Sequence, residues 1–347
     1  MPDVDPQGGS LNPRLRQRLR TGAAPLPAPA AWASAIRAGD RGLLSRGITL
    51  LESTRSADRA AAAALVEACL PYAVDGLRIG ITGSPGVGKS TFIERAGRYL
   101  IERGHRVAVL AVDPSSELSR GSILGDKTRM PELTTDPQAY VRPSPAGTTL
   151  GGVARYTREA ITLCEAAGYD RLLVETVGVG QSETAVYHLT DCFVLLLLPG
   201  AGDELQGIKR GIVEMADLVW INKADGANTA AAKATQRAYR NALHLFPPKA
   251  SGWTVPALRG SGLTGNHLDK WYQTLQQFNT HVRTNGHFER QRIAQRRAGF
   301  RGALREELWD WLRQRPGVAA LLDRLEPAVA AGEQSIAGAV QALLRQL

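Results

Sequence analysis

The sequence has little cysteine and no long hydrophobic run, which argues against a disulfide-stabilised protein and against a membrane-spanning one. Its three cysteines, Cys69, Cys164 and Cys192, are far apart and odd in number. They predict small core residues in a reducing compartment rather than a disulfide framework. The longest apolar run, near residues 193–198, has the length of a strand rather than of a membrane span. The first residues lack the basic and then apolar plan of a signal peptide, so we expect a cytoplasmic protein.

Clustered metal ligands and nucleic-acid-binding patterns are missing as well. The histidines are scattered and no cysteine pair accompanies them, which argues against a site that holds a transition metal. Much of the net charge of +9 comes from two basic runs, residues 14–20 and 290–297, which have no interleaved aromatic residues. We expect solvated or interface faces there, able to attract acidic partners, rather than nucleic-acid contacts. The histidines are His105, His188, His244, His267, His281 and His287.

The sequence does contain enough apolar material for a packed core. Of its 347 residues, 44% are hydrophobic and 22% are charged, which suits one large domain with appendages. Residues 1–31, rich in proline and alanine near their end, predict a flexible tail. Helical spacing of apolar residues begins at Trp32 and predicts an N-terminal helical segment over residues 32–76, interrupted at Gly39 and Asp40.

One stretch, from Leu77 to Thr91, organises the rest of the chain. Its apolar, β-branched half predicts a buried strand, and residues 83–90 then match the pattern Gly-x-x-x-x-Gly-Lys-Ser of a phosphate-binding loop. Glycines let the backbone N–H groups turn inwards, and the helix expected from Phe92 directs its positive end at the same place. We predict that Lys89 reaches the β- and γ-phosphates of a nucleotide and that the Ser90 hydroxyl binds Mg²⁺. The predicted phosphate-binding residues are Gly83, Ser84, Pro85, Gly86, Val87, Gly88, Lys89, Ser90 and Thr91.

Strand and helix patterns alternate after this loop, as in βαβ units. Apolar runs at residues 107–112, 171–174, 192–198, 218–221 and 254–258 predict further strands. We therefore predict an α/β fold, with a mostly parallel P-loop NTPase sheet flanked by helices, over residues 77–283. The long connection over residues 113–152 is typical of a functional loop. Residues 284–347 predict a C-terminal helical arm.

The residues after the strand at 218–221 suit a guanine base. Asn222-Lys223-Ala224-Asp225 matches the guanine-reading pattern of GTPases. The Asp225 carboxylate can accept hydrogen bonds from the ring N–H and the amino group of guanine, a pair of donors that adenine does not offer. The stem of Lys223 can cover one face of the base. The sequence therefore predicts GTP in preference to ATP.

Carboxylates at two other strand ends are candidate magnesium ligands. Glu175 and Gly178 follow the strand expected beside the phosphate-binding loop, where the acid can hold Mg²⁺ and the glycine amide can face the γ-phosphate. Asp113 ends the strand before the long connection, and Asp126 lies inside that connection. The alternative for each acid is an ordinary capping or turn residue. Gln181 is a candidate for orienting the attacking water.

With these residues in place, the chain resembles the MeaB/MMAA/ArgK family of P-loop GTPases, the chaperones of methylmalonyl-CoA mutase and related adenosylcobalamin-dependent acyl-CoA mutases. The resemblance runs from about Trp32 to the C-terminus and is most specific between Leu77 and Asp225. Beyond the phosphate-binding loop it rests on long literal phrases. These are Ile48 to Thr54, Asp113 to Ser116, Gly121 to Met130, Arg142 to Pro145, Glu175 to Gln181 and Gly202 to Lys209.

The resemblance implies a slow GTPase that uses GTP and Mg²⁺, is accelerated by its mutase, gates cofactor delivery and forms a homodimer through the C-terminal arm. The stretch Gly202 to Lys209 resembles the family's extra switch, which senses the partner. The family's second guanine-contacting loop usually reads Ser-Ala, whereas Ser261-Gly262-Leu263 stands here. Carried over to this sequence, Lys89 and Ser90 bind phosphate and Mg²⁺, Asp113, Asp126 and Glu175 form the metal and switch shell, and Asn222, Lys223 and Asp225 read guanine.

Two other functions stand as alternatives. A metal-insertion GTPase would need a cluster of cysteine and histidine ligands to hold its metal in transit, and the scattered histidines do not provide one. A kinase associated with a transport system would use ATP, which the carboxylate of Asp225 disfavours. We expect neither a membrane nor a nucleic acid as a partner of this protein.

Overall fold

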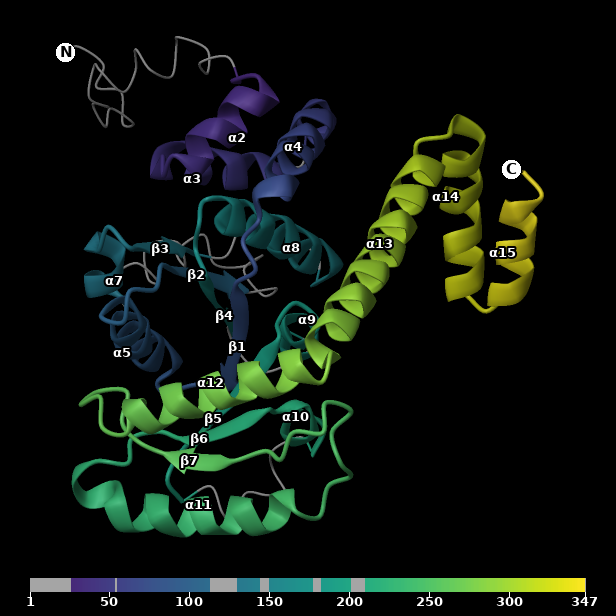
Figure 1. Cartoon of the computed structure of the whole chain (residues 1–347). Helices are drawn as coiled ribbons and strands as arrows, with labels where there is room; N and C mark the ends of the chain where they lie inside the picture. Colours follow the sequence, from purple (N-terminus) through teal and green to yellow (C-terminus); the bar gives the residue numbers. More distant parts are fainter. Residues whose placement is uncertain are drawn as a thin grey trace, which may run out of the picture.

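The centre of the molecule is a parallel β-sheet (Figure 1). The computed structural model describes residues 26–53, 55–112, 130–143, 150–176, 182–200 and 210–346, and within them seven strands pair in the order β3-β2-β4-β1-β5-β6-β7. Every pair of neighbours is parallel. The prediction of an α/β fold is confirmed. The strands are β1 (Leu77–Gly83), β2 (Val107–Val112), β3 (Ala139–Arg142), β4 (Arg171–Thr176), β5 (Cys192–Leu197), β6 (Leu218–Ile221) and β7 (Ala257–Arg259).

Helices cover both faces of the sheet, which explains why its strands are apolar along their whole length. On one face, Leu110 and Val112 of β2 pack with α2, α3, α4, α8 and α9, and the far end of that face carries α10 and α11. Val107 and Val109 point to the other face, which α5, α7, α12 and the start of α13 cover. These helices are α2 (Pro29–Arg37), α3 (Arg41–Leu51), α4 (Ser56–Cys69), α5 (Lys89–Ile101), α7 (Pro131–Thr135), α8 (Leu150–Ala166), α9 (Ser182–Tyr187), α10 (Arg210–Met215), α11 (Thr229–Leu243), α12 (Leu268–Thr284) and α13 (His287–Arg313).

The edge strand β3 is the strand that the sequence pattern does not reveal. It lies inside the connection that we expected to be a long loop, and α7 precedes it. Its four residues pair with β2 alone, from Val107 opposite Ala139 to Leu110 opposite Arg142. A strand this short shows no periodicity of its own, so its pairing with β2 decides its structure. The described part of the connection therefore belongs to the sheet.

The N-terminal helices break where the sequence predicts. α2 ends at Arg37, and α3 begins after Asp40, whose carboxylate accepts a hydrogen bond from the Leu43 amide at 2.9 Å. This is an N-cap, which satisfies one of the free amides of the first helical turn. Trp32 and Ile36 of α2 are buried in the same hydrophobic cluster as the sheet residues of that face. The N-terminal helical segment is thus packed directly on the sheet.

A buried network of charges fastens the first turns of α13 to the sheet. The Arg292 guanidinium donates to both carboxylate oxygens of Asp191, at 2.5 and 2.7 Å, and to the Gly76 carbonyl at 2.8 Å. Glu165 binds the side chain of Arg78 at 2.7 and 2.8 Å and lies 3.5 Å from Arg292. Because buried charges are stable only when they are paired, these four side chains depend on one another.

Beyond this anchor α13 leaves the body of the molecule and leads to α14 (Pro316–Ala330) and α15 (Ile336–Leu344), as Figure 1 shows. α14 and α15 pack on each other through a small cluster that includes Leu321, Leu325 and Leu343. The apolar stripe predicted on α13 is 41–69% exposed, so the described part of the chain does not cover it. Its residues are Ile293, Phe300, Leu304, Leu308 and Trp311.

The cysteines are core residues, as predicted. Cys69, Cys164 and Cys192 are all buried and free. Burial raises the pKa of the Cys69 thiol to about 11, so this thiol stays protonated and unreactive at neutral pH. Among the helices of the described residues, none combines the length and the apolar character that a membrane span requires.

Candidate nucleotide-binding site

The phosphate-binding loop joins the end of β1 to the start of α5. α5 begins at Lys89, three residues before the predicted start at Phe92. Gly88 is the N-cap, with φ +93°, and no side chain caps the helix, so the first-turn amides are available to an anion. A Cβ at Gly88 would lie 2.9 Å from the Asn222 side-chain nitrogen. The loop therefore needs glycine here for its backbone angle and for this close approach.

Lys89 places its charge inside the loop. Its Nζ donates to the carbonyl oxygens of Gly83 at 2.8 Å and of Ser84 at 3.4 Å. Ser84, Pro85 and Gly86 are exposed, so the loop opens to solvent. The ammonium group and the amino end of α5 together suit a ligand with several anionic oxygens, such as a nucleotide triphosphate.

A serine hydroxyl and a buried carboxylate meet beside this loop. Ser90 Oγ donates to Glu175 Oε1 at 3.1 Å, and Glu175 is only 5% exposed. The two residues come together because β4 lies next to β1, with Glu175 opposite Ile81. Hydroxyl and carboxylate oxygens are the ligands that Mg²⁺ prefers, so this pair fits the ion. The other predicted members of the shell, Asp113, Asp126, Gly178 and Gln181, lie outside the described residues.

The guanine-reading motif is bonded directly to the phosphate-binding loop. Asn222 is buried, and its Nδ2 donates to the Val87 carbonyl at 2.9 Å. Lys223 adopts φ +54° and donates from Nζ to the Gly86 carbonyl at 2.8 Å. The stem of Lys223 therefore extends along the exposed side of the loop. The structure brings together two motifs that are more than a hundred residues apart in sequence.

The loop at residues 261–263 completes this arrangement. The Gly262 amide donates to Asn222 Oδ1 at 2.9 Å, and the buried Ser261 hydroxyl accepts from the Leu263 amide at 3.2 Å. A Cβ at Gly262 would lie 2.8 Å from the Cα of Phe92, closer than real contacts allow. This close contact explains why glycine stands at this position of the loop. Asp225 is half-buried, and its carboxylate makes no hydrogen bond to any described residue, so it can accept bonds from a base.

Two buried aromatic residues that the sequence does not mark as functional, Trp220 and Phe92, pack against the residues of the site. The indole nitrogen of Trp220 donates to Asn222 Oδ1 at 3.3 Å, and its ring lies 5.4 Å from the ring of Phe92. Trp220 thereby holds the orientation of Asn222, and Phe92 packs between it and the Gly262 loop. In the sequence both rings read as ordinary core residues of a strand and a helix, so no local signal marks this role.

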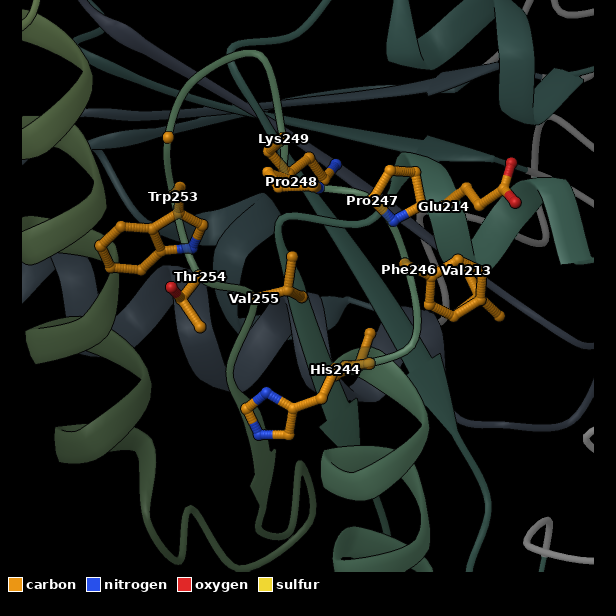
Figure 2. A pocket seen from close by; sticks show the side chains of 12 residues that line it. Val213, Glu214, His244, Phe246, Pro247, Pro248, Lys249, Trp253, Thr254 and Val255 are labelled. Carbon is orange, nitrogen blue, oxygen red and sulfur yellow. The ribbon is translucent and has the colours of Figure 1, made fainter.

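A separate cavity of about 400 Å³ lies away from this site (Figure 2). The cavity is lined by α10 and by the segment between α11 and β7. It therefore lies where the chain enters β6 and β7, at the amino ends of these strands, whereas the phosphate-binding loop follows the carboxyl end of β1. Its Lys249 is already bound to Asp217 at 3.1 Å and to the Met215 carbonyl at 2.8 Å. None of the predicted site residues lines this cavity.

The contact between the guanine-reading motif and the phosphate-binding loop places the chain among the P-loop GTPases. Within that class it belongs to the family described as methylmalonyl Co-A mutase-associated GTPase MeaB, whose family model matches residues 44–316. The family resemblance seen in the sequence is confirmed. GTP is accordingly the nucleotide of this chain, and GTP hydrolysis is its reaction.

Several relatives are similar over most of the chain. A putative GTPase of Caulobacter vibrioides is 52% identical, over 88% of this chain and 94% of that protein. GTPase ArgK of Escherichia coli is 44% identical, over 80% and 84% of the two chains. The mouse protein described as methylmalonic aciduria type A homolog, mitochondrial, is 44% identical, over 88% and 76%. A crystal structure described as LAO/AO transport system kinase has a TM-score of 0.73 and 34% identity, and the match covers 93% of this chain and 99% of that one.

Proposed function

We propose that this protein is a GTP-hydrolysing chaperone of methylmalonyl-CoA mutase or a related acyl-CoA mutase. It would gate the loading of adenosylcobalamin into the mutase and protect the loaded enzyme. The family description names an association with methylmalonyl-CoA mutase, and this is the observation that carries the proposal. We also propose a cytoplasmic location for this role.

Within the site we propose the roles that the sequence predicted. Lys89 and the residues 83–91 bind the phosphates, Ser90 and Glu175 hold Mg²⁺ with Asp113 and Asp126, and Gln181 orients the attacking water. When bound, Mg²⁺ neutralises charge that develops on the phosphates during hydrolysis. Asn222, Lys223 and Asp225, with the backbone of the loop 261–263, select guanine. The Ser90–Glu175 contact and the bonds from Asn222 and Lys223 to the loop support these roles.

We also propose that the chain divides at the predicted boundaries, into a tail (1–31), an N-terminal helical segment (32–76), a GTPase domain (77–283) and a C-terminal arm (284–347). α14 and α15 support a distinct arm because they form a hydrophobic cluster of their own. The exposed apolar stripe on α13 supports a homodimer, since a second copy of the chain would cover it.

The proposal is tested by titrating an adenosylcobalamin-dependent acyl-CoA mutase into a GTPase assay while the affinities for GTP and GDP are measured in parallel. A nucleotide switch works only if the partner binds the GTP and GDP forms with different free energies. Linkage then requires that mutase binding change the ratio of the GTP and GDP affinities by the same factor as the mutase's own preference between the two forms. We expect GTP turnover to rise, and Gln206→Ala or Lys209→Ala, in the segment predicted to sense the partner, to reduce that rise without weakening GTP binding.

Two controls make the outcome decisive. Lys89→Ala should lose GTP binding and hydrolysis with or without the mutase, because the charge-assisted contact to the phosphates is gone. Wild-type affinity for ATP should be far below that for GTP, and equal affinities would favour the kinase alternative. If the mutase binds but neither the turnover nor either nucleotide affinity changes, the chaperone switch is wrong.

A further inference from the structure

The outer face of α11 is a concentrated positive surface. Lys233, Arg237 and Arg240 follow one another at intervals of four and three residues, so they lie on one side of the helix, and all three are exposed. Together with Arg259 of β7 they line an open groove of about 760 Å³. α11 is the outermost helix at the end of the molecule opposite α14 and α15 (Figure 1). This end of the protein therefore presents a basic patch to solvent, with small and neutral side chains between its cations.

The described part of the chain contains no acid paired with the cations of this patch. From residue 226 to residue 268 the sequence contains five lysines and arginines and no aspartate or glutamate. Lys249, the one remaining cation of this stretch, is neutralised by Asp217. Within the described residues, no ion pair involves Lys233, Arg237, Arg240 or Arg259, in contrast to the arginines of the core, which are paired with acids. Like charges at this spacing repel one another, so they cost stability unless a ligand uses them.

We propose that this α11 patch, defined by Lys233, Arg237, Arg240 and Arg259, docks a carboxylate-rich surface of a partner protein. Charge complementarity of this kind steers association and selects the partner rather than supplying most of the affinity. A protein is favoured over a nucleic acid because alanines separate the cations, at positions 230, 234 and 238, and no aromatic side chain lines the groove for stacking on bases. Four cations are also fewer than duplex binding usually employs.

The inner face of α11 links this patch to the nucleotide site. The buried Thr235 hydroxyl accepts a hydrogen bond from the Gly200 amide at 3.0 Å, and Gly200 is the last described residue before the segment predicted to sense the partner. At its amino end α11 follows Asp225 after the single turn Gly226–Asn228. A protein docked on α11 therefore lies one helix away from the guanine motif and from the start of that segment. If the proposed mutase is the partner, its docking on α11 can affect the nucleotide site through the Thr235–Gly200 contact and the turn that follows Asp225.

The test is a comparison of two triple charge reversals with equal change in net charge. One carries Lys233→Glu, Arg237→Glu and Arg240→Glu in the patch. The control carries Arg55→Glu, Lys270→Glu and Arg345→Glu, which are exposed and distributed elsewhere. Each is titrated with a labelled oligo-glutamate peptide, with a DNA duplex and with an adenosylcobalamin-dependent acyl-CoA mutase, at low and at high salt. GTP affinity reports whether each variant is folded.

We expect the patch variant to bind the peptide about tenfold more weakly than the wild type at low salt, and to associate with the mutase about tenfold more slowly. The control should stay close to the wild type, and high salt should remove the difference. Equal losses in both variants would show that only net charge matters and would overturn the proposal. Tighter, patch-dependent binding of the duplex would assign the surface to nucleic acid instead. If the wild type binds the peptide through the patch but does not bind the mutase, the chaperone role is refuted, whereas the proposal of an acid-binding α11 patch is supported.

Discussion

At the scale of single residues, the site depends on a few groups that hold two distant segments together. Asn222 is central, because its amide binds the Val87 carbonyl and its oxygen accepts from both Gly262 and Trp220. This side chain is fully used by the protein, so its contribution to guanine recognition is to position the motif. We propose that the specificity itself rests on Asp225, whose carboxylate makes no hydrogen bond to a described residue.

We predict that Gly262→Ala damages both stability and nucleotide binding. The new Cβ would lie 2.8 Å from the backbone of Phe92, which cannot move without shifting the first turn of α5. Overpacking of this kind costs roughly 1–3 kcal/mol of unfolding free energy, and the displaced amide would also weaken its bond to Asn222. Urea unfolding and GTP calorimetry measure the two effects.

The matched control is Gly302→Ala in α13, where an added Cβ meets no atom within 4 Å. Alanine in a helix interior is favoured over glycine by up to about 1 kcal/mol, so this variant should be as stable as the wild type or more so. If Gly262→Ala retains both wild-type stability and wild-type GTP affinity, the close contact with Phe92 is not a constraint.

At the scale of elements, α13 is held by ionic bonds rather than by an extended apolar face. Its first turns bury Phe288 and Arg292, whereas most of its apolar side chains further along are exposed. Glu307 and Asp310, later in the helix, pair with Arg59 of α4 at 3.2 and 2.9 Å, but these partners are about 40% exposed. Solvent screens such exposed pairs, so the buried network around Arg292 carries the attachment.

We therefore predict that Arg292→Met lowers the free energy of unfolding by about 3–5 kcal/mol, because it leaves the buried carboxylate of Asp191 without its cation. Arg296→Met, one turn later on the same helix and exposed, should change stability by less than about 0.5 kcal/mol. Urea denaturation of the two variants makes the comparison. A similar small loss for both would mean that the network contributes little to holding α13.

At the scale of the whole molecule, the C-terminal arm carries apolar surface that the described part of the chain leaves exposed. Besides the exposed apolar stripe on α13, the arm has a hollow of about 350 Å³ that is lined by α14, α15 and Trp309, and nearly all of these lining residues are apolar. Large apolar patches of this kind on a chain usually mark an interface. A cut before α13 would be a poor test, since Phe288 and Arg292, at the base of the arm, are buried against the GTPase domain.

We predict that the wild-type chain is a dimer and that Phe300→Glu with Leu304→Glu makes it a monomer that still binds GTP. Both side chains are exposed, at 69% and 44%, so the changes should not disturb the single chain. Light scattering at micromolar concentration gives the mass, and calorimetry gives the GTP affinity. Leu245→Glu, which replaces an 85% exposed leucine outside the arm, should leave the dimer intact. A wild type that is already monomeric would contradict the prediction.

Much of this protein follows from local sequence patterns. The phosphate-binding loop, the guanine motif, the strands β2 and β6 with their observed bounds and the break at Gly39 and Asp40 were all predictable. Each of these features is encoded by neighbouring residues, through glycine freedom, apolar runs or a capping side chain. The parallel sheet followed in turn, because alternating strands and helices leave few other ways to bury both faces.

Tertiary structure alone decided the remaining features, because each depends on residues far apart in the chain. β3 is too short to be read from its own residues and exists by pairing with β2. Arg292 lies in a basic run that the sequence assigns to a solvated or interface face, yet it is buried inside the chain because Asp191 and Glu165 pair with it there. Gly262 cannot give way to alanine only because α5 passes so close to it. A local sequence pattern indicates which secondary structure a segment favours. The free-energy cost of burying a charge or a side chain depends instead on which residues the fold places in contact with it.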